Sequence, residues 1–465
     1  MQNFIDEIEQ RTPAGIAAAI GRLIASGRLA PGDRLPTVRV LAGELGVSPA
    51  TVSHAWQALS AVGLIVSRGR GGTFVQDAAP KWLPARSQSM IGTVGPARLD
   101  LSRGTPDPLL LPALGPALSR VSQRAVTPSY QDLPILPELL EVLRGSWPYR
   151  VETITIVDGA LDAISRCLDA VTRFGDRVIV ENPSFPPFFD LLDQLGLERL
   201  PVAVDEHGII PADFAAALKL GPAVVLLQPR AQNPTGASMT AQRAEELASL
   251  MRNTPASADT IVIEDDHSAE ISIAPDVSLG LWLPARTLHV RSFSKSHGPD
   301  LRMAALGGPA ALIDPIVSRR MLGPGWTSRM LQTILHDLLT NGESMAQVSE
   351  ARRIYFARQR ALADALTGFG LDVLQADGIN TWLPVQNERD ALVRLAASGI
   401  RVAGGSPFLA NPILSNPYLT NNGGPAFVRV TAGALPDDVI PVAEALAAAA
   451  HPLDSAVHPV GARWS

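Results

Sequence analysis

The sequence predicts an α/β protein with two folded domains: a small domain of helices and a hairpin, then a large domain built on a mostly parallel sheet. The chain has 465 residues, more than one compact domain usually holds. The first part carries three short helical patterns and a glycine-rich turn, whereas strand and helix patterns alternate from about residue 100 onward. The predicted boundaries are 1–77 for the small domain, 78–98 for a linker and 99–465 for the large domain, with a smaller C-terminal α/β subdomain at about 345–450.

The composition is that of an ordinary globular protein, with 46% hydrophobic and 18% charged residues. The net charge of −6 would repel phosphate, so any contact with nucleic acid must come from a local basic patch. Cys167 is the only cysteine, which excludes a disulfide framework and a thiolate metal cluster, and we expect no metal site. Because the first residues are acidic and no apolar run approaches membrane-spanning length, we expect a cytoplasmic protein.

Three helices are predicted in the small domain. Thr12-Pro13 opens the first, because threonine can cap free N–H groups and proline is tolerated at the first helical position. The second spans 37–45 and stops at a glycine. Ser48-Pro49 repeats the cap, and the apolar stripe of the third helix leaves Ser53 and His54 facing outward.

A basic hairpin follows the third helix. Two strand-like segments, 64–67 and 73–76, flank the turn 68–72, which holds two arginines and three glycines. Three helices followed by such a hairpin are the plan of a winged helix-turn-helix. Its last helix enters the major groove of DNA, and its hairpin contacts the backbone or the minor groove.

The motifs Gly27-Arg-Leu-x-Pro-Gly-Asp-Arg-Leu-Pro36 and Gly63-Leu-Ile-x-x-Arg-x-Arg-Gly-Gly-Thr-Phe-Val75 resemble the GntR-type DNA-binding domain, and the likeness covers nearly all of residues 12–76. In that family the residues that match Arg39, Ser48, Thr51 and the wing pair Arg68 and Gly69 lie at the DNA. With the outward-facing residues and the second wing arginine, the resemblance implies these DNA contacts: Arg39, Ser48, Thr51, Ser53, His54, Arg68, Gly69 and Arg70.

One position departs from that family. Pro49-Ala50 stands where the recognition helix usually has a basic residue, so a guanidinium for phosphate or guanine is missing. Affinity is then weaker or the sequence preference unusual. The alternative for Arg39 is a purely structural role, either in an ion pair with Glu44 or in solvating a helix face.

The linker and the large domain follow. The linker is rich in Pro, Ala and Ser without periodicity, and it is long enough to let the small domain reach a partner subunit. Helical patterns such as 161–171 and 240–251 lie between strands, so the sheet is predicted to be mostly parallel with helices on both faces. The predicted strands are 153–157, 177–181, 223–228, 260–264, 287–291 and 304–307.

Polar residues follow the carboxyl ends of these strands, the edge at which such sheets bind ligands. Lys295 can form a Schiff base with the aldehyde of pyridoxal 5′-phosphate (PLP), and Asp265 can keep the pyridine nitrogen protonated. Gly159-Ala160 begins a helix whose free N–H groups suit a phosphate. The other expected contacts are Phe185 stacking on the ring, Asn233 donating to O3′, and Arg302 with Ser292 or Ser294 donating to the phosphate.

The patterns Asn233-Pro-Thr-Gly, Asp265-x-His267 and Ser292-x-Ser-Lys followed by Arg302 resemble the fold-type I PLP enzymes of the class I/II aminotransferase family, over roughly residues 98–450. The resemblance implies that Tyr130 reaches the PLP phosphate of a neighbouring subunit. It also implies that Arg429 clamps a ligand carboxylate.

Three positions depart from the aminotransferase pattern. His267 replaces the tyrosine that contacts PLP O3′, Leu161 replaces a polar residue near the phosphate, and Asp300 replaces a glycine. A histidine can still hydrogen-bond O3′, although its charge near pH 7 would tune the cofactor differently. The pattern therefore favours PLP binding over efficient transamination.

A GntR-type winged helix joined to an aminotransferase-like domain resembles the MocR subfamily of transcription regulators, from end to end of the chain. The resemblance implies a homodimer, head-to-tail, with the PLP site between subunits. It also implies that affinity for double-stranded operator DNA changes with PLP or with a PLP adduct of an amino acid or amine.

Two other functions stay open. The first is a working aminotransferase that carries a DNA-binding domain, which turnover of an amino acid with an oxo acid would favour. The second is a DNA-binding protein whose large domain is only a dimerisation scaffold. The joint presence of Asn233, Asp265, Lys295 and Arg302 argues against the scaffold, because a scaffold needs none of them.

Overall fold

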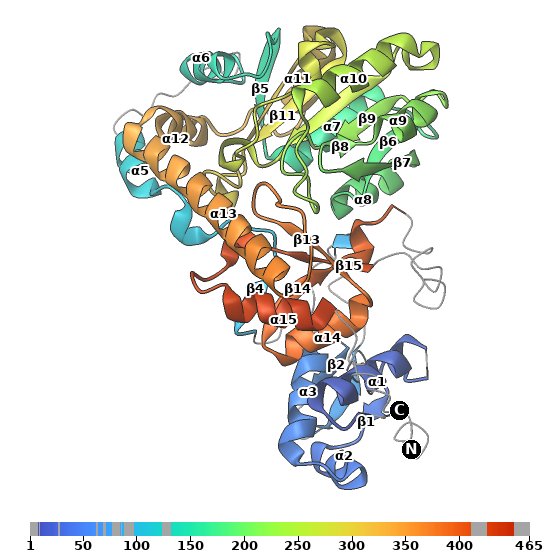
Figure 1. The fold of residues 1–465 in the computed structure, drawn as a ribbon. Helices are drawn as coiled ribbons and strands as arrows, with labels where there is room; N and C mark the ends of the chain where they lie inside the picture. Colours follow the sequence, from blue (N-terminus) through green and yellow to red (C-terminus); the bar gives the residue numbers. More distant parts are fainter. Residues whose placement is uncertain are drawn as a thin grey trace, which may run out of the picture.

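The computed structural model of the protein describes residues 8, 10–26, 28–61, 64–67, 71–76, 84, 86–87, 97–122, 132–410 and 426–450. The wing residues Arg68, Gly69 and Arg70, as well as Tyr130, lie outside these described residues. The described parts form a small helical domain, a large α/β part and a smaller α/β part between them (Figure 1).

The small domain has the predicted order of elements. Its helices are α1 (Pro13–Ala25), α2 (Val38–Leu45) and α3 (Pro49–Ala61). The Thr12 Oγ1 atom accepts a hydrogen bond from the Gly15 N–H at 3.1 Å, so the predicted cap is present. The strands β1 (Arg34–Leu35), β3 (Thr73–Val75) and β2 (Ile65–Ser67) form an antiparallel sheet in that order.

The large part is built on a sheet of eight strands in the order β5-β12-β11-β10-β9-β6-β7-β8. The central pairs β11-β10, β10-β9, β9-β6 and β6-β7 are parallel, whereas β12 is antiparallel to both its neighbours. The strands are β5 (Thr153–Val157), β6 (Arg177–Asn182), β7 (Glu198–Asp205), β8 (Gly208–Ile209), β9 (Val224–Leu227), β10 (Ile261–Asp266), β11 (Thr287–Ser292) and β12 (Ala304–Gly308). All six predicted strands are therefore present, and β7 and β8 were not predicted.

Helices cover both faces of this sheet, since separate apolar cores lie on its two sides. The helices of the large part are α5 (Leu114–Ser122), α6 (Pro137–Gly145), α7 (Ala160–Val171), α8 (Pro186–Gln194), α9 (Pro211–Leu218), α10 (Ala241–Asn253), α11 (Ala310–Met321) and α12 (Arg329–Thr340). The long helix α13 (Gly342–Gly368) runs from there to the smaller part (Figure 1).

The smaller part is a four-stranded sheet in the order β13-β15-β14-β4, packed against helices. Its elements are β13 (Thr381–Val385), α14 (Glu388–Ala397), β14 (Ile400–Gly404), β15 (Ala426–Val430) and α15 (Ile440–Ala450). The strand β4 (Leu99–Leu101) comes directly after the linker and pairs in parallel with β14. The segment that follows the linker is thus part of this subdomain.

The small domain packs against α14 through α1 and α3 (Figure 1). Val393 of α14 is 1% exposed and belongs to the apolar core of the small domain, together with side chains such as Ile16 and Leu59. The Arg389 side chain lies against Gly21 of α1. The helices that would read DNA are therefore attached to the subdomain formed by β13, α14 and β14.

Candidate functional site

A cavity of about 680 Å³ lies beyond the carboxyl ends of β9, β10 and β11 and extends to β14 and β15. It brings together ten of the predicted site residues, from segments far apart in the sequence. They are Ala160, Phe185, Asn233, Asp265, His267, Ser292, Ser294, Lys295, Arg302 and Arg429.

Lys295 follows β11, and its Nζ donates to the carbonyl oxygen of Gly104. Burial, aided by the nearby Arg429 guanidinium, lowers the pKa of Lys295 from 10.5 to about 8. A much larger fraction of this amine is therefore neutral near pH 7 than for an exposed lysine. A neutral amine is the form that attacks an aldehyde.

Asp265 is the second-last residue of β10 and is buried. Its Oδ2 accepts from Gln228 Nε2 at 2.7 Å, whereas its Oδ1 has no hydrogen-bond partner among the described residues. Burial raises the pKa of Asp265 to about 7. A buried acceptor with nothing to accept from needs an explanation, and the protonated nitrogen of a pyridine ring fits this atom.

The start of α7 forms an anion cradle with Arg302. Gly159 has a φ of 103°, and a Cβ there would lie 2.9 Å from Arg302 Nη2. A larger residue at position 159 would thus push the guanidinium away from the helix N-terminus. Ser292 and Ser294 line the same cavity. Free N–H groups, a guanidinium and hydroxyls are the donors that a phosphate requires.

His267 is half-buried next to Lys295. Burial, followed by the positive charge of Lys295, lowers the pKa of His267 to about 3. Its Nδ1 lies 3.3 Å from Ser268 Oγ. The imidazole is therefore neutral throughout the physiological range, and it does not add a pH-dependent charge beside the cofactor.

Arg429 on β15 is a buried guanidinium without an ion-pair partner among the described residues. It donates to the Ser102 carbonyl and, at 3.4 Å, to Asn233 Oδ1, and it lies 5.0 Å from the Phe408 ring centre. Burial lowers the pKa of Arg429 to about 10. Because a buried charge is costly unless it is paired, this residue is suited to hold a ligand carboxylate.

The residues of the cavity wall that the sequence analysis missed include Ser87, Asp100, Gln228 and Arg401. Gln228 directly follows β9, so the rule that selected the other residues at strand ends could have found it. Ser87, Asp100 and Arg401 come from the linker, β4 and β14, and no sequence signal connects these segments with the larger sheet.

The expected DNA-contact residues within the described chain lie on α2 and α3. Arg39, Ser48 and His54 are exposed, and Thr51 and Ser53 are half-buried. Ser48 Oγ accepts from the Thr51 N–H at 3.2 Å, so this serine also caps α3. Among the described residues, Arg39 has no ion pair with Glu44, whereas the other alternative, an exposed arginine that only solvates its helix face, is equally compatible with its position.

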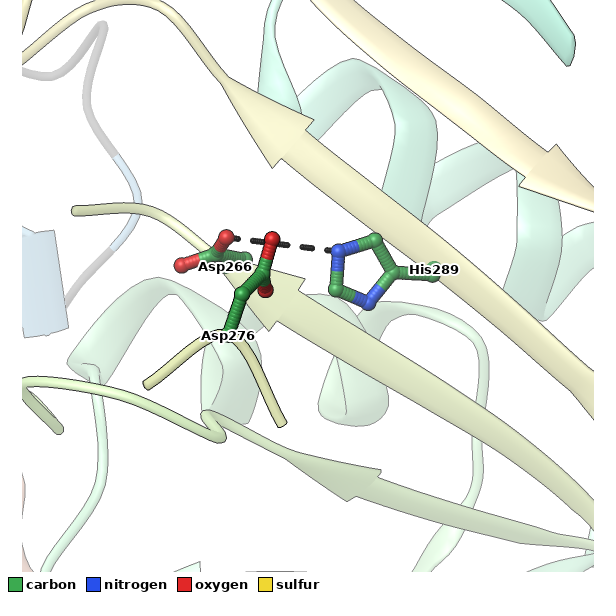
Figure 2. Close-up of side chains that lie close together, drawn as sticks. All are labelled: Asp266, Asp276 and His289. Atoms are coloured by element: carbon green, nitrogen blue, oxygen red, sulfur yellow. Dashed lines mark ion pairs between the residues drawn. The ribbon is translucent and has the colours of Figure 1, made fainter. Parts of the chain in front are cut away.

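A cluster of acidic and imidazole groups lies on β10, on β11 and on the segment between these strands (Figure 2). Asp266, Asp276 and His289 come close enough to hold a cation, but two guanidiniums already occupy the cluster. Arg230 Nη2 lies 2.5 Å from Asp266 Oδ2, and Arg291 Nη2 lies 2.9 Å from Asp276 Oδ2. The Arg230 charge holds the pKa of Asp266 at about 2. The cluster is an ion-pair network that ties β10 to β11.

Comparison with known families decides the identity of the chain. Residues 12–75 match the family described as bacterial regulatory proteins of the gntR family, and residues 97–446 match aminotransferase class I and II. The chain belongs to the MocR subfamily of GntR-type regulators. The predicted fold class and family are thereby confirmed.

Two relatives match this MocR-type chain over most of its length, and a solved structure shares the fold of its larger part. The vitamin B6 salvage pathway transcriptional repressor PtsJ of Salmonella typhimurium is 37% identical over 86% of this chain and 92% of its own length. The transcriptional regulator TauR of Rhodobacter capsulatus is 30% identical over 83% of this chain and 87% of its own. The α-aminoadipate aminotransferase LysN of Thermus thermophilus, solved with N-(5′-phosphopyridoxyl)-L-leucine, shares the fold with a TM-score of 0.66 at 22% identity, over 76% of this chain and 91% of its own.

The protein is therefore a DNA-binding transcription regulator of MocR type, and its cavity binds PLP. The residues of the cavity agree with this cofactor. The unpaired Asp265 Oδ1 matches its ring nitrogen, the Gly159–Arg302 cradle its phosphate and the partly neutral Lys295 its aldehyde. No helix of the described chain is long and apolar enough to cross a membrane.

Proposed function

We propose that PLP, or a PLP adduct with an amino acid or amine, changes the affinity of this regulator for operator DNA. The observation that carries the proposal is the packing of α1 and α3 on α14. The strand β14 follows α14 directly, and β15 pairs with β14, so Arg401 and Arg429 of the cavity lie in the sheet that supports the DNA-binding helices. A ligand that favours one position of this sheet thereby favours one position of those helices.

The residues of the cavity have separate roles toward the cofactor. PLP supplies an aldehyde that condenses with primary amines and a pyridinium ring that withdraws electrons. Lys295 would hold the aldehyde carbon, Asp265 the ring nitrogen, and Gly159, Ala160, Arg302, Ser292 and Ser294 the phosphate. Asn233 and His267 would hydrogen-bond O3′, and Phe185 would cover the ring face.

The effector in this proposal is a small compound with an amine and a carboxylate. The amine reacts at the position of Lys295, and the carboxylate pairs with the buried Arg429. The DNA face in turn consists of Arg39, Ser48, Thr51, Ser53, His54 and the wing residues Arg68, Gly69 and Arg70. Because these contacts would act on duplex operator DNA, we propose a cytoplasmic location for the protein.

We infer that the protein acts as a head-to-tail homodimer in which Tyr130 completes the phosphate site of the partner subunit. Large apolar side chains are exposed around α5 and α12, which pack together. Leu118 lies on α5 and Met330 on α12, and the neighbouring segments of the chain add Leu109, Leu133 and Leu322. Exposed apolar side chains gathered in this way are typical of an interface between subunits.

A working aminotransferase is the second candidate function. The observation that favours it is the lowered pKa of Lys295, which an enzyme also requires for proton transfer. The two functions differ in turnover, because a regulator needs only to bind its effector. Formation of an oxo acid from amino acids over many cycles would support the enzyme.

The test measures fluorescence anisotropy of the protein on DNA from its own upstream intergenic region, with unrelated DNA at matched salt as the control. PLP is expected to change the affinity of the wild-type protein at least about threefold, and that of Lys295→Ala much less. Arg360→Gln, an exposed change on α13, serves as the matched charge control. Equal affinity with and without PLP and its adducts would refute the proposal.

A further inference from the structure

A short piece of the linker is fastened to the large part of the molecule. Asp190 of α8 accepts three hydrogen bonds from it: the Arg86 N–H at 3.2 Å, the Ser87 N–H at 3.1 Å and the Ser87 hydroxyl at 3.1 Å. Both carboxylate oxygens of Asp190 are used. One side chain therefore fixes the position and the direction of the linker at this point.

The Arg86 side chain makes a second attachment. Its guanidinium donates to the carbonyl oxygens of Leu409, at 2.8 Å, and Ala410, at 3.2 Å, and it lies 4.7 Å from the ring centre of Phe189. Burial lowers the pKa of Arg86, so the contact is partly shielded from water. Arg86 thus bridges α8 and the segment that follows β14.

This attachment lies at the ligand cavity. Ser87 lines the cavity together with Phe185 and Phe188, which belong to the start of α8. Phe408, the residue before Leu409, lies against the guanidinium of Arg429. The linker therefore forms part of the cavity wall through Ser87. In addition, Arg86 binds Leu409, the neighbour of the Phe408 ring that contacts Arg429.

We propose that Arg86, Ser87 and Asp190 form a linker clasp that is part of the effector site, and that an amino-acid adduct of PLP stabilises it. The cofactor contacts do not require Ser87, which leaves this part of the wall to the effector portion of an adduct. Because coupling is reciprocal, a closed clasp also tightens binding of the adduct. The identity of the ligand rests on the proposed function, whereas the clasp itself rests on the contacts of Asp190.

Trypsin reports on the clasp, because Arg86-Ser87 is itself a tryptic site and hydrogen-bonded chain resists cleavage until it opens. The rate is followed by mass spectrometry of the fragment that begins at Ser87. The variant Asp190→Asn weakens the clasp. Asp193→Asn on the same helix is the matched control, since Asp193 pairs with Arg199 and also lies near Arg86.

We expect cleavage of Asp190→Asn to be about tenfold faster than that of the wild type, and that of Asp193→Asn to differ by less than about twofold. N-(5′-phosphopyridoxyl)-L-leucine is expected to slow cleavage of the wild type and Asp193→Asn at least about threefold, and of Asp190→Asn hardly at all. Arg86→Lys keeps a tryptic site but cannot hold both carbonyls, and it should resemble Asp190→Asn. Cleavage at the wild-type rate in both clasp variants, or no protection by the adduct, would overturn the inference.

Operator binding separates this inference from the proposed function. If the adduct shifts the operator affinity of the wild type and of Asp190→Asn equally, the clasp carries no signal and the inference fails while the proposed function stands. If the adduct shifts the operator affinity of the wild type but not that of Asp190→Asn, the clasp transmits the effect of the adduct to the DNA-binding domain. If neither PLP nor the adduct changes the operator affinity of the wild type, the proposed function is refuted. The rates of tryptic cleavage then test by themselves whether the clasp exists.

Discussion

The Lys295 amine must lose its proton before it attacks an aldehyde, and burial beside Arg429 makes that proton weakly held. With a pKa of about 8, the rate of PLP attachment should rise about tenfold per unit below pH 8 and level off above it. Arg429→Gln removes the second cause of the shift and should move the midpoint upward, by at most about one unit. Stopped-flow absorbance of the bound cofactor measures this, with Lys295→Ala as the blank. A midpoint near that of an exposed lysine would contradict the buried geometry.

Asp265 and Asp266 are neighbours whose pKa values are shifted in opposite directions. Burial raises the pKa of Asp265 to about 7, whereas Arg230 lowers that of Asp266 to about 2. The charged form of Asp265 therefore destabilises the cofactor-free fold increasingly between about pH 4 and pH 7, and the full penalty persists above that range.

Asp265→Asn should accordingly stabilise the cofactor-free protein at pH 8, by up to about 4 kcal/mol, and should do so less at pH 5. It should also weaken PLP binding at least about tenfold, because an amide cannot keep the ring nitrogen protonated. Asp266→Asn should destabilise the protein at both pH values, since Arg230 loses its buried partner. Urea unfolding at the two pH values measures both. Equal effects of the two variants would show that the environments do not differ.

At the scale of single residues, the strand-end rule located several of the residues that line the cavity, because parallel strands deliver their carboxyl ends to one edge. It found Lys295, Asp265 and Asn233, which line the cavity, but the state of His267 depends on burial that the sequence does not show. Ser87 was also out of reach, since a linker serine has no motif and acquires its place only through Asp190.

At the scale of elements, α14 joins the two halves of the protein. Val393→Asp puts a charge into the apolar contact with α1 and α3, which should separate the small domain from α14 without unfolding it, because Ile16, Leu41 and Leu59 keep their own core. The operator affinity should then lose most of its dependence on PLP. Ala397→Asp, at an exposed position of α14, is the control. If the operator affinity of Val393→Asp still depends on PLP as in the wild type, the contact between α14 and the small domain does not transmit the effect of PLP.

The elements also show where prediction from sequence ends. The six predicted strands are apolar runs and are buried, whereas β7 (Glu198–Asp205) contains a proline and is mostly half-exposed, so its pattern is weak. β4 is three residues long and is defined only by pairing with β14, about 300 residues further along the chain. The attachment of the small domain to α14 likewise depends on a surface that no local pattern describes.

We expect the whole molecule to be a dimer, because two helices that pack together, α5 and α12, both expose large apolar side chains. Leu118 and Met330 are 51% and 67% exposed on these two packed helices. The double variant Leu118→Glu/Met330→Glu should shift the protein from dimer to monomer in light scattering. It should also weaken PLP binding, because Tyr130 of the second subunit would no longer reach the phosphate.

Leu220→Glu is the matched control, since Leu220 is 50% exposed but follows α9, away from α5 and α12. This variant should leave unchanged both the oligomeric mass measured by light scattering and the affinity for PLP. Operator binding adds a further distinction, because a dimer holds two winged helices on two half-sites. The monomeric variant should therefore bind a full operator no more tightly than a half-site, whereas the wild type gains from the second contact at a higher effective concentration. A double variant that stays dimeric would place the subunit interface elsewhere, and with it the source of the tyrosine that completes the phosphate site.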